Sequence, residues 1–286
     1  MTITEEGLLA YRFDPIAFRV SARDAILYGL GLGLGADPTD ARQLRHVYEA
    51  GLVPYPTMPV VLGSPGMWFG KAGLDARKVL HGAQALEVLS PLPMETNLVA
   101  TNAVSDLVDR GPDKGAVVEV TRRIDTADGQ PVARVVSTYM CMGDGGFGGT
   151  RSRAAGAPPA RPDRAPDATA RIATLPQAAL IYRLNGDMNP LHADPAMAAR
   201  LGFDRPILHG LCTLGHATRA LLGETADGEA SRLRALSARM SRPVYPGETL
   251  EIALWRAGGQ VLFEASAVER GVTVLSGGQL QLEGTA

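Results

Sequence analysis

Two similar series of short alternating segments limit most strongly what this chain can fold into. Within each segment apolar and polar residues alternate, which is typical of antiparallel strands with one buried face. Glycine pairs or Gly-containing turns separate several of the segments. Each series therefore predicts a three-strand meander. The segments are residues 91–110, 115–130 and 131–143 in the first series, and 249–257, 260–270 and 272–283 in the second.

The two series also open with similar phrases. Ser90 to Leu98 reads SPLPMETNL, and Arg242 to Leu250 reads RPVYPGETL. This degenerate repeat indicates an ancient duplication that produced two units, each with a helix and an antiparallel sheet. Because pairing a sheet with its copy removes two unprotected edges, we expect the two sheets to join.

A segment rich in Gly, Pro, Ala and Arg lies between the two series, at residues 143–170. It has almost no large apolar side chain that could anchor it, which is typical of a linker. A linker of this length could span about 90 Å when extended, so the units could lie side by side. We expect one unit at residues 1–142, a linker at 143–170 and a second unit at 171–286.

The second unit contains the clearest helix pattern, PILHGLCTLGHATRALLG. Leu211, Leu214, Ala217 and Leu221 recur at the spacing of one buried helical face, and Gly223 stands where a C-terminal cap is expected. One helix and one antiparallel sheet in each unit predict an α+β fold.

Charge and cysteine content exclude several classes of function. The net charge is −2 and no run is dense in Lys or Arg, so we expect no nucleic-acid partner and no membrane partner. No leader pattern and no 18-residue apolar run is present, so the expected location is cytoplasmic. Cys141 and Cys212 lack metal-ligand spacing, and we expect buried thiols in a reducing compartment.

The loop YRLNGDMNPLHADP, Tyr182 to Pro195, carries the strongest signal for chemistry. Gly186 allows backbone angles that a side chain would forbid, and Pro190 keeps Asn189 out of helical geometry. Asp194 and Pro195 supply a helix N-cap and a first-turn proline. A loop fixed at both ends can hold Asp187 and His192 at a constant separation, as acid–base catalysis requires. A local Asx-turn with a capping His is an equally good interpretation of the composition.

Gly210, at the start of the expected helix, favours catalysis over a purely local role. Its N–H is one of the unpaired donors at a helix N-terminus, and its missing side chain lets a ligand oxygen approach. An acid–base pair with such an oxyanion donor suits the addition of water to an α,β-unsaturated thioester. Water must lose a proton, C2 must gain one, and charge must rest on the thioester oxygen. This chemistry needs no metal and no redox cofactor.

Two other patterns have weaker interpretations. Residues 29–36 read GLGLGLGA, but a dinucleotide site needs a strand before its glycines, and a helix-like segment precedes these. Residues 187–194 offer oxygen and nitrogen ligands, but Pro190 and Leu191 stand where a calcium loop needs other residues. We therefore expect neither a dinucleotide nor a metal.

The segment YRLNGDMNPLHADPAMAARLGFDRPILHG resembles the signature of the MaoC-like, type 2 enoyl-CoA hydratases: an aromatic residue, Gly-Asp-x-Asn-Pro-x-His and a downstream Ile-x-His-Gly. RVSARDAILYGLGLG, VLHGAQALEVLSPLP, GDGGFGG and RPVYPGETL are also similar to segments of two-unit members. The resemblance implies a double hotdog fold, in which each unit wraps an antiparallel sheet around a long central helix.

Carried over by position, the resemblance makes Asp187 and His192 the catalytic pair. Asn189 would orient the water, the Gly210 N–H would hold the thioester oxygen, and Thr218 would lie near the substrate. The implied reaction is reversible hydration of a trans-2-enoyl-CoA to a (3R)-3-hydroxyacyl-CoA, without a cofactor other than the coenzyme A thioester that is the substrate.

The resemblance also assigns a role to the first unit. It lacks the Gly-Asp-x-Asn-Pro-x-His pattern, so we expect it to be catalytically silent and to accommodate the acyl chain, with His81 and Gly82 lining the groove. Relatives commonly associate, and we expect a homodimer. Five arginines in or next to the linker could meet coenzyme A phosphates, or could simply be solvated: Arg151, Arg153, Arg161, Arg164 and Arg171.

Three alternatives remain open at this stage. One is a 3-hydroxyacyl-thioester dehydratase that works on coenzyme A or acyl-carrier-protein thioesters, since one site catalyses both directions. A second is a non-catalytic acyl-CoA-binding subunit, which would be expected to lack Asp187 or His192. A thioesterase of the same fold would place a carboxylate on the central helix, where GLCTLGHATRALLG has none.

Overall fold

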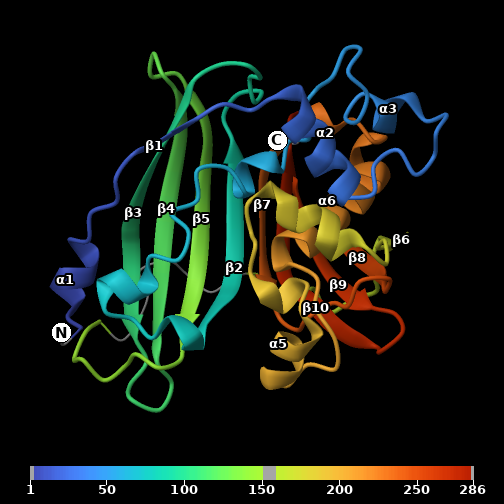
Figure 1. Cartoon of the computed structure of the whole chain (residues 1–286). Coiled ribbons are helices and arrows are strands. Elements are labelled where there is room, and N and C mark those ends of the chain that lie inside the picture. The colour runs from blue at the N-terminus through green and yellow to red at the C-terminus, as the bar shows by residue number, and fades with distance from the viewer. Residues whose placement is uncertain (1–2, 151–158, 285–286) are drawn as a thin grey trace.

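The computed structural model describes residues 3–150 and 159–284, and in this part of the chain ten strands form one antiparallel sheet (Figure 1). From edge to edge their order is β1-β3-β4-β5-β2-β7-β10-β9-β8-β6. The strands are β1 Ile16–Phe18, β2 Val79–Val88, β3 Leu98–Asp109, β4 Ala116–Thr126, β5 Pro131–Cys141, β6 Ala168–Ala173, β7 Leu233–Met240, β8 Thr249–Ala257, β9 Gln260–Ala267 and β10 Val272–Leu282.

The second half of the sheet repeats the first half in mirror order. Strands β2 and β7 meet at the centre, where the antiparallel register runs from Ala83 opposite Arg239 to Glu87 opposite Ala235. Counting outward, β5 corresponds to β10, β4 to β9, β3 to β8 and β1 to β6. This arrangement confirms that the two sheets join, and each inner edge strand is protected by the other.

The longest helix, α6 (Gly210–Ala226), lies against β6, β7 and β8. It begins at Gly210 as the sequence predicts. The prediction that Gly223 caps its C-terminus is wrong, because the helix continues to Ala226 and Asp227 takes the left-handed conformation at φ 50°. The N–H of Asp227 and that of Gly228 both donate to Leu222 O and so close the helix end.

The first half has a different helix arrangement. Helix α2 (Ala22–Gly31) starts with a capping box between Ser21 and Asp24, and it packs on α4 (Ala178–Tyr182). Since α2 follows β1 as α4 follows β6, these two helices are counterparts. The remaining helices are α1 Glu5–Leu9, α3 Ala41–Leu44 and α5 Pro195–Arg200, with 3-10 turns η1 Met58–Val60, η2 Phe69–Ala72, η3 Ala76–Lys78, η4 Arg183–Asn185, η5 Pro190–His192 and η6 Ala230–Arg232.

A long central helix occurs in only one half of the described chain. In the first half an irregular segment, residues 52–78 with its 3-10 turns, lies over β3, β4 and β5, and Figure 1 shows its cyan part crossing these strands. Trp68, Phe69 and Leu74 of this segment pack in one apolar cluster with Val104 and Val118 of the sheet. The expectation of a long helix in each unit is therefore wrong for the first.

The segment expected to be a linker has more contacts than its composition indicates. The Asp109 carboxylate accepts the backbone N–H groups of Gly146, Gly148 and Gly149, as well as that of Gly111. These bonds lower the pKa of Asp109 to about 2 and hold residues 143–149 on the first half. Residues 151–158 lie outside the described part.

Three of the five arginines in this region pair with nearby carboxylates. Arg161 lies 3.8 Å from Glu264, Arg164 2.5 Å from Asp167, and Arg171 2.7 Å from Glu251. These contacts hold the segment that leads into β6 on the second half of the sheet. Arg151 and Arg153 lie outside the described residues.

The two cysteines and the lengths of the helices can also be compared with what the sequence predicts. Cys141 and Cys212 are free and buried, as the sequence predicts. Within residues 3–150 and 159–284, no helix combines the length and the apolar character needed to cross a bilayer.

Candidate active site

The loop between α4 and α5 has the backbone geometry that its sequence predicts. Gly186 adopts φ 117°, and Asn189 before Pro190 adopts φ −52° and ψ 123°, outside the helical region. The Asp194 carboxylate accepts the Ala196 N–H at 2.8 Å and caps α5, with Pro195 in its first turn. The loop is therefore fixed at both ends.

His192 is held in one orientation by a backbone carbonyl. Its Nδ1 lies 2.8 Å from Ile207 O, and because a carbonyl can only accept, Nδ1 carries the proton and Nε2 keeps its lone pair in the neutral ring. Burial lowers the pKa of His192, while the Ile207 bond and Asp187 act in the opposite direction. At neutral pH the ring is a neutral base.

A second imidazole, His209, stacks on His192 with ring centroids 3.7 Å apart and planes at 23°. Its Nε2 donates to Asp187 O at 3.2 Å, which fixes the backbone at Asp187. Burial, and then the neighbouring His192, lower the pKa of His209 to about 4. This residue was not predicted from the sequence, although it is the histidine of the Ile-x-His-Gly motif that contains Gly210.

The two polar residues of the loop have local bonds and free acceptor positions. Asp187 is exposed, and its Oδ1 accepts the Asn189 N–H at 3.2 Å, while Asn189 Oδ1 accepts the Leu191 N–H at 3.0 Å. The predicted Asx-turn is thus present. No donor to Asp187 Oδ2 occurs among the described residues, so one carboxylate oxygen can serve a ligand or water.

Asp187, His192 and His209 form one cluster. One side-chain oxygen of Asp187 and one ring nitrogen of each histidine all lie within 4.8 Å of one another. Arg183, which donates to Met188 O at 3.2 Å, lies close enough to lower the pKa of both histidines. Asp187 and His192, which were predicted to act together, therefore lie close to each other.

The same cluster can be tested as a metal site. A metal ion lies about 2.1 Å from an imidazole nitrogen, along a lone pair in the plane of the ring. The rings of His192 and His209 are stacked nearly parallel, so no position near both lies in both planes. This donor set does not fit a metal, and the expectation of none stays a prediction that the geometry supports.

The N-terminus of α6 follows the cluster directly. Its N-cap residue is His209, and no side chain caps the helix. Within the described residues the Gly210 N–H has no hydrogen-bond acceptor. A Cβ at Gly210 would lie 2.9 Å from Met240 Cγ, so a side chain would crowd this point. The helix end presents a free backbone donor, as an oxyanion site requires.

The first half contributes the facing wall. His81 and Gly82 lie on β2 at a break in its register with β5, and the His81 ring is 5.3 Å from the ring of Tyr139. Burial lowers the pKa of His81 to about 4, and Asp187 is close enough to oppose that shift. A Cβ at Gly82 would lie 2.8 Å from Met140 Cγ. The candidate site thus lies where β2 meets β7.

Thr218 is not brought to this cluster. It is fully buried two turns into α6, and its hydroxyl donates to Leu214 O at 2.8 Å. The hydroxyl is therefore used within the helix, and the position gives no support to a substrate contact.

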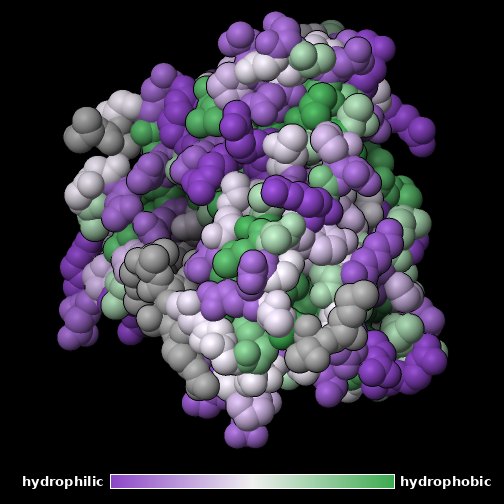
Figure 2. All heavy atoms as spheres, turned by 90° about the vertical axis from the view of Figure 1, so that its left-hand side faces the viewer, coloured by the Kyte–Doolittle hydropathy of each residue, from purple (hydrophilic) through white to green (hydrophobic). Residues whose placement is uncertain are grey.

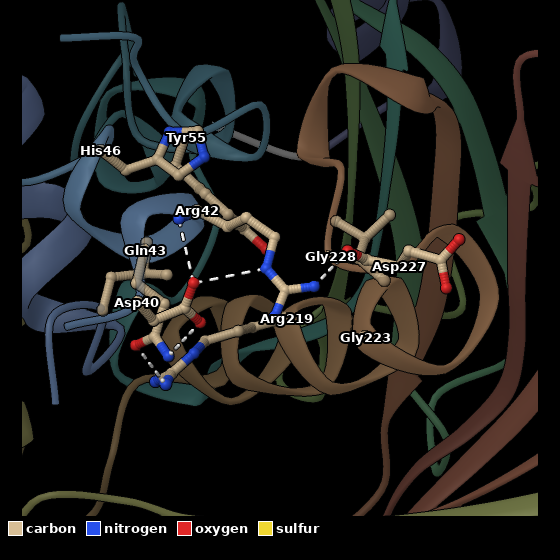
Figure 3. A pocket seen from close by; sticks show the side chains of 11 residues that line it. Asp40, Arg42, Gln43, His46, Tyr55, Arg219, Gly223, Asp227 and Gly228 are labelled. Carbon is tan, nitrogen blue, oxygen red and sulfur yellow. Dashed lines mark hydrogen bonds and ion pairs between the residues drawn. The ribbon is translucent and has the colours of Figure 1, made fainter. Parts of the chain in front are cut away.

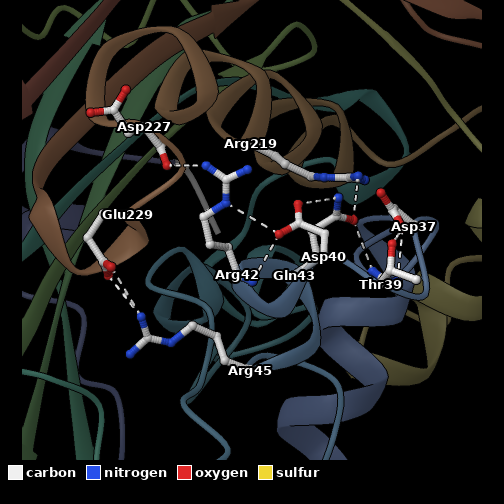
Figure 4. Close-up of polar contacts among 10 residues, drawn as sticks. Asp37, Thr39, Asp40, Arg42, Gln43, Arg45, Arg219, Asp227 and Glu229 are labelled. Atoms are coloured by element: carbon white, nitrogen blue, oxygen red, sulfur yellow. Dashed lines mark hydrogen bonds and ion pairs between the residues drawn. The ribbon is translucent and has the colours of Figure 1, made fainter.

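A separate hollow lies beside the C-terminal half of α6. It has a volume of about 200 Å³ and is lined mainly by polar residues of residues 34–55 and the C-terminal half of α6, including Arg42, Gln43 and Arg219 (Figure 3). Arg219 donates to Leu32 O and Gly33 O. It also donates to Gln43, and Arg42 donates to Asp227 O (Figure 4). Most of these polar groups bind one another, so they connect the two halves.

Comparisons with known proteins cover nearly the whole chain. Residues 158–277 match the family described as MaoC like domain, and residues 18–143 match the MFE-2 hydratase 2 N-terminal domain. The chain is 37% identical to Enoyl-CoA hydratase ChsH3 of Mycobacterium tuberculosis, over 98% of this chain and 99% of that protein. It is 40% identical to 3-hydroxyacyl-thioester dehydratase Y of the same organism, over 85% and 84%.

Larger relatives and solved structures agree with this match. Peroxisomal multifunctional enzyme type 2 of Drosophila melanogaster is 39% identical over 93% of this chain, which spans 46% of that enzyme's length. The crystal structure of a MaoC-like dehydratase from Phytophthora capsici has a TM-score of 0.86 and 32% identity, and the match covers 98% of this chain and 99% of that one. The fold is a double hotdog.

Proposed function

This chain belongs to the MaoC-like family of type 2 enoyl-CoA hydratases, and on that premise we propose that it reversibly hydrates trans-2-enoyl-CoA to (3R)-3-hydroxyacyl-CoA. The observation that carries the proposal is the convergence of Asp187 and His192 within 4.8 Å. The uncapped start of α6 follows this cluster in the chain.

The acid–base steps follow from the positions of the protons. His192 Nε2 and the free oxygen of Asp187 face a water molecule from two sides, and together they accept its proton as the oxygen bonds to C3. The same pair returns a proton to C2, so the catalytic groups end in their starting state. Asn189 fixes the loop through its bond to Leu191 N–H and helps to orient the water.

Charge on the thioester oxygen is stabilised by the backbone. As water adds, electrons move from the C2–C3 double bond toward the carbonyl, and its oxygen becomes an enolate oxygen. The Gly210 N–H, reinforced by the dipole of the 17-residue helix α6, donates to that oxygen. This donor is in place before the substrate arrives, so little reorganisation is needed.

The decisive experiment replaces Asp187 by Asn. Because the amide keeps the size but cannot accept the proton, kcat/KM should fall by roughly 10² to 10⁴. The loss of the conjugated thioester absorbance measures the rate, and chiral analysis identifies the product. Asp194→Asn is the matched control in the same loop, since Asn also caps helices and activity should persist. Near-full activity of Asp187→Asn would refute the assignment.

The alternatives can be compared with this geometry. A dehydratase uses the same site in the reverse direction, and a relative at 40% identity is named as one, so the direction of flux depends on the thioester supplied. A non-catalytic binding subunit would not need the fixed His192 and Asp187 pair.

We also propose the roles of the two units, the absence of a cofactor, the location of the protein and its oligomeric state. Residues 1–142 form the silent unit that receives the acyl chain and 171–286 the catalytic unit, with 143–170 connecting them. The protein works without a metal or cofactor, as a cytoplasmic homodimer. Dialysis against a chelator and sedimentation velocity test the cofactor and the dimer.

A further inference from the structure

Arg122 on β4 is a buried cation with few partners. Only 4% of the residue is exposed, and its Nη2 donates to Val60 O at 3.0 Å. Its Nε and Nη1 are buried without any hydrogen-bond partner among the described residues. No ion pair to Arg122 occurs in that part of the chain, and burial lowers its pKa to about 10. Such a group costs stability unless something pairs with it.

Asn102 lies directly beside it. Asn102 on β3 is the register partner of Arg122 on β4, so the two side chains are neighbours on the same face of the sheet. Asn102 Nδ2 donates to Gly63 O at 3.2 Å, and its Oδ1 is buried without a partner. Both residues therefore reach the irregular segment that covers the sheet. The unused atom of Asn102 is an acceptor, so the free donors at this position are those of Arg122.

These two residues separate two apolar clusters. Along β4, Val120 belongs to one cluster and Ile124 to the other, with Arg122 between them. Along β3, Val104 and Ala100 flank Asn102 in the same way. The bonds to Val60 O and Gly63 O hold the covering segment on the sheet, but they leave two guanidinium nitrogens of Arg122 unused, and a bound anion would account for these.

Arg122 lies on the same face of the sheet as Tyr139, because Tyr139 pairs with Val118, which is four residues before Arg122 on β4. Asp187 is close enough to raise the pKa of Tyr139, and Arg122 close enough to lower it. The same two residues act in these opposite directions on the pKa of His81. On β5, Tyr139 is four residues from Val135, the register partner of Arg122. This spacing is about 13 Å along the strand.

We propose that Arg122 forms a subsite for a carboxylate at the far end of the acyl chain, so that the preferred substrates are enoyl-CoA thioesters of dicarboxylic acids. This inference rests on the proposed hydratase function. With C2 and C3 at Asp187 and His192, a chain that continues along the first half passes His81 and Tyr139 and ends at the unpaired guanidinium. An anion both neutralises the buried charge and accepts the unused N–H groups.

Arg122→Met tests the subsite, since it removes the charge and keeps an unbranched chain. Trans-2-enoyl-CoA esters of graded length are assayed in matched pairs, one ending in a methyl group and the other in a carboxylate. At the length that reaches Arg122, the wild-type ratio of kcat/KM should favour the carboxylate. The variant should lose that preference by about 10- to 100-fold. Hydration of crotonyl-CoA, which is too short to reach Arg122, should be unchanged.

Arg123→Met is the matched control, because Arg123 is the next residue of β4 and its side chain is 65% exposed. It should keep the wild-type preference. Thermal melts establish that Arg122→Met folds, and its melting temperature should equal or exceed that of the wild type, since a buried unpaired charge is removed.

The outcomes separate this inference from the proposed function. If the wild type hydrates crotonyl-CoA but treats both members of every pair alike, the subsite is refuted and the hydratase function stands. If the wild type prefers hydroxyl-ended chains to methyl-ended ones as strongly as it prefers carboxylate-ended chains, the role of charge is refuted. If no enoyl-CoA is hydrated, calorimetry with the saturated carboxylate-ended and methyl-ended thioesters measures the subsite separately. Equal affinities would then refute it as well.

Discussion

Individual residues set the protonation state on which the chemistry depends. The Nδ1 proton of His192 is directed to Ile207 O, and the ring stacks on His209, whose own proton is directed to Asp187 O. Each ring has one orientation and one tautomer. The lone pair of His192 Nε2 is therefore the basic position of this ring.

The pH dependence of the reaction follows from burial of His192. Burial lowers its pKa from 6.5, so this proposed base stays neutral at pH values at which an exposed histidine is protonated. The acid limb of a kcat/KM profile should therefore have its midpoint below pH 6.5. A profile from pH 4.5 to 8 with a short enoyl-CoA measures it. A midpoint at or above 6.5 would mean that His192 is not the neutral base.

The sequence identifies those site residues whose role depends on nearby residues in the chain. Gly186, Pro190 and Asp194 have local backbone effects, so the position of Asp187 and His192 on a fixed loop could be predicted. The stacking of His209 on His192 could not, because it depends on how the start of α6 meets that loop. Arg122 was missed for a similar reason, since its burial depends on the segment that covers the sheet.

At the scale of elements, the close contact between α2 and α6 depends on a glycine. Gly215 faces Leu32, the C-cap residue of α2, and a Cβ at Gly215 would lie 2.5 Å from Leu32 Cδ2. Leu32 is fully buried and cannot move outward. The glycine thus determines how closely the first half approaches α6.

Two alanine substitutions in α6 should have opposite effects. Gly215→Ala should destabilise the protein by about 1 to 3 kcal/mol, because the methyl group overpacks the contact with Leu32. Gly223→Ala lies on the same helix with open space around its Cβ, so it should stabilise by about 0.5 to 1 kcal/mol. Urea titrations give both values. Equal effects at the two positions would contradict this account of the contact.

Elements with regular patterns were predicted better than irregular ones. The alternating strands β3 to β5 and β8 to β10 and the start of α6 follow from the sequence. Strands β1, β2, β6 and β7 were not predicted, and in β2 the register shift at Gly82 breaks the alternation. The counterpart of α6 was expected in the first half because the duplication implied it. Sequence could not show that residues 52–78 replace it.

At the scale of the whole molecule, buried neutral histidines couple stability to pH. His209 and His216 have pKa values lowered to about 4 from 6.5, mainly by burial. Between these values the unfolded chain binds protons that the folded chain does not, so stability is full above pH 6.5 and is lost as the pH falls.

Thermal melts between pH 7.5 and 5.5 test this coupling. At pH 5.5 each of the two rings should cost about 1 kcal/mol, and the melting temperature should fall by several degrees. His216→Gln removes one ring away from the candidate site and should reduce the slope of melting temperature against pH. A melting temperature that is constant over this range would show that the rings are protonated in the folded protein.

The irregular covering of the first half has a consequence for how such chains diverge. In the described structure every group assigned to proton transfer comes from the second half, while the first half supplies a wall built on a sheet and closed by residues 52–78. A covering of this kind tolerates insertions and exchanges that a helix in register with its sheet would not. Duplication would thus have left one copy to preserve the proposed reaction and the other free to change its specificity for acyl groups.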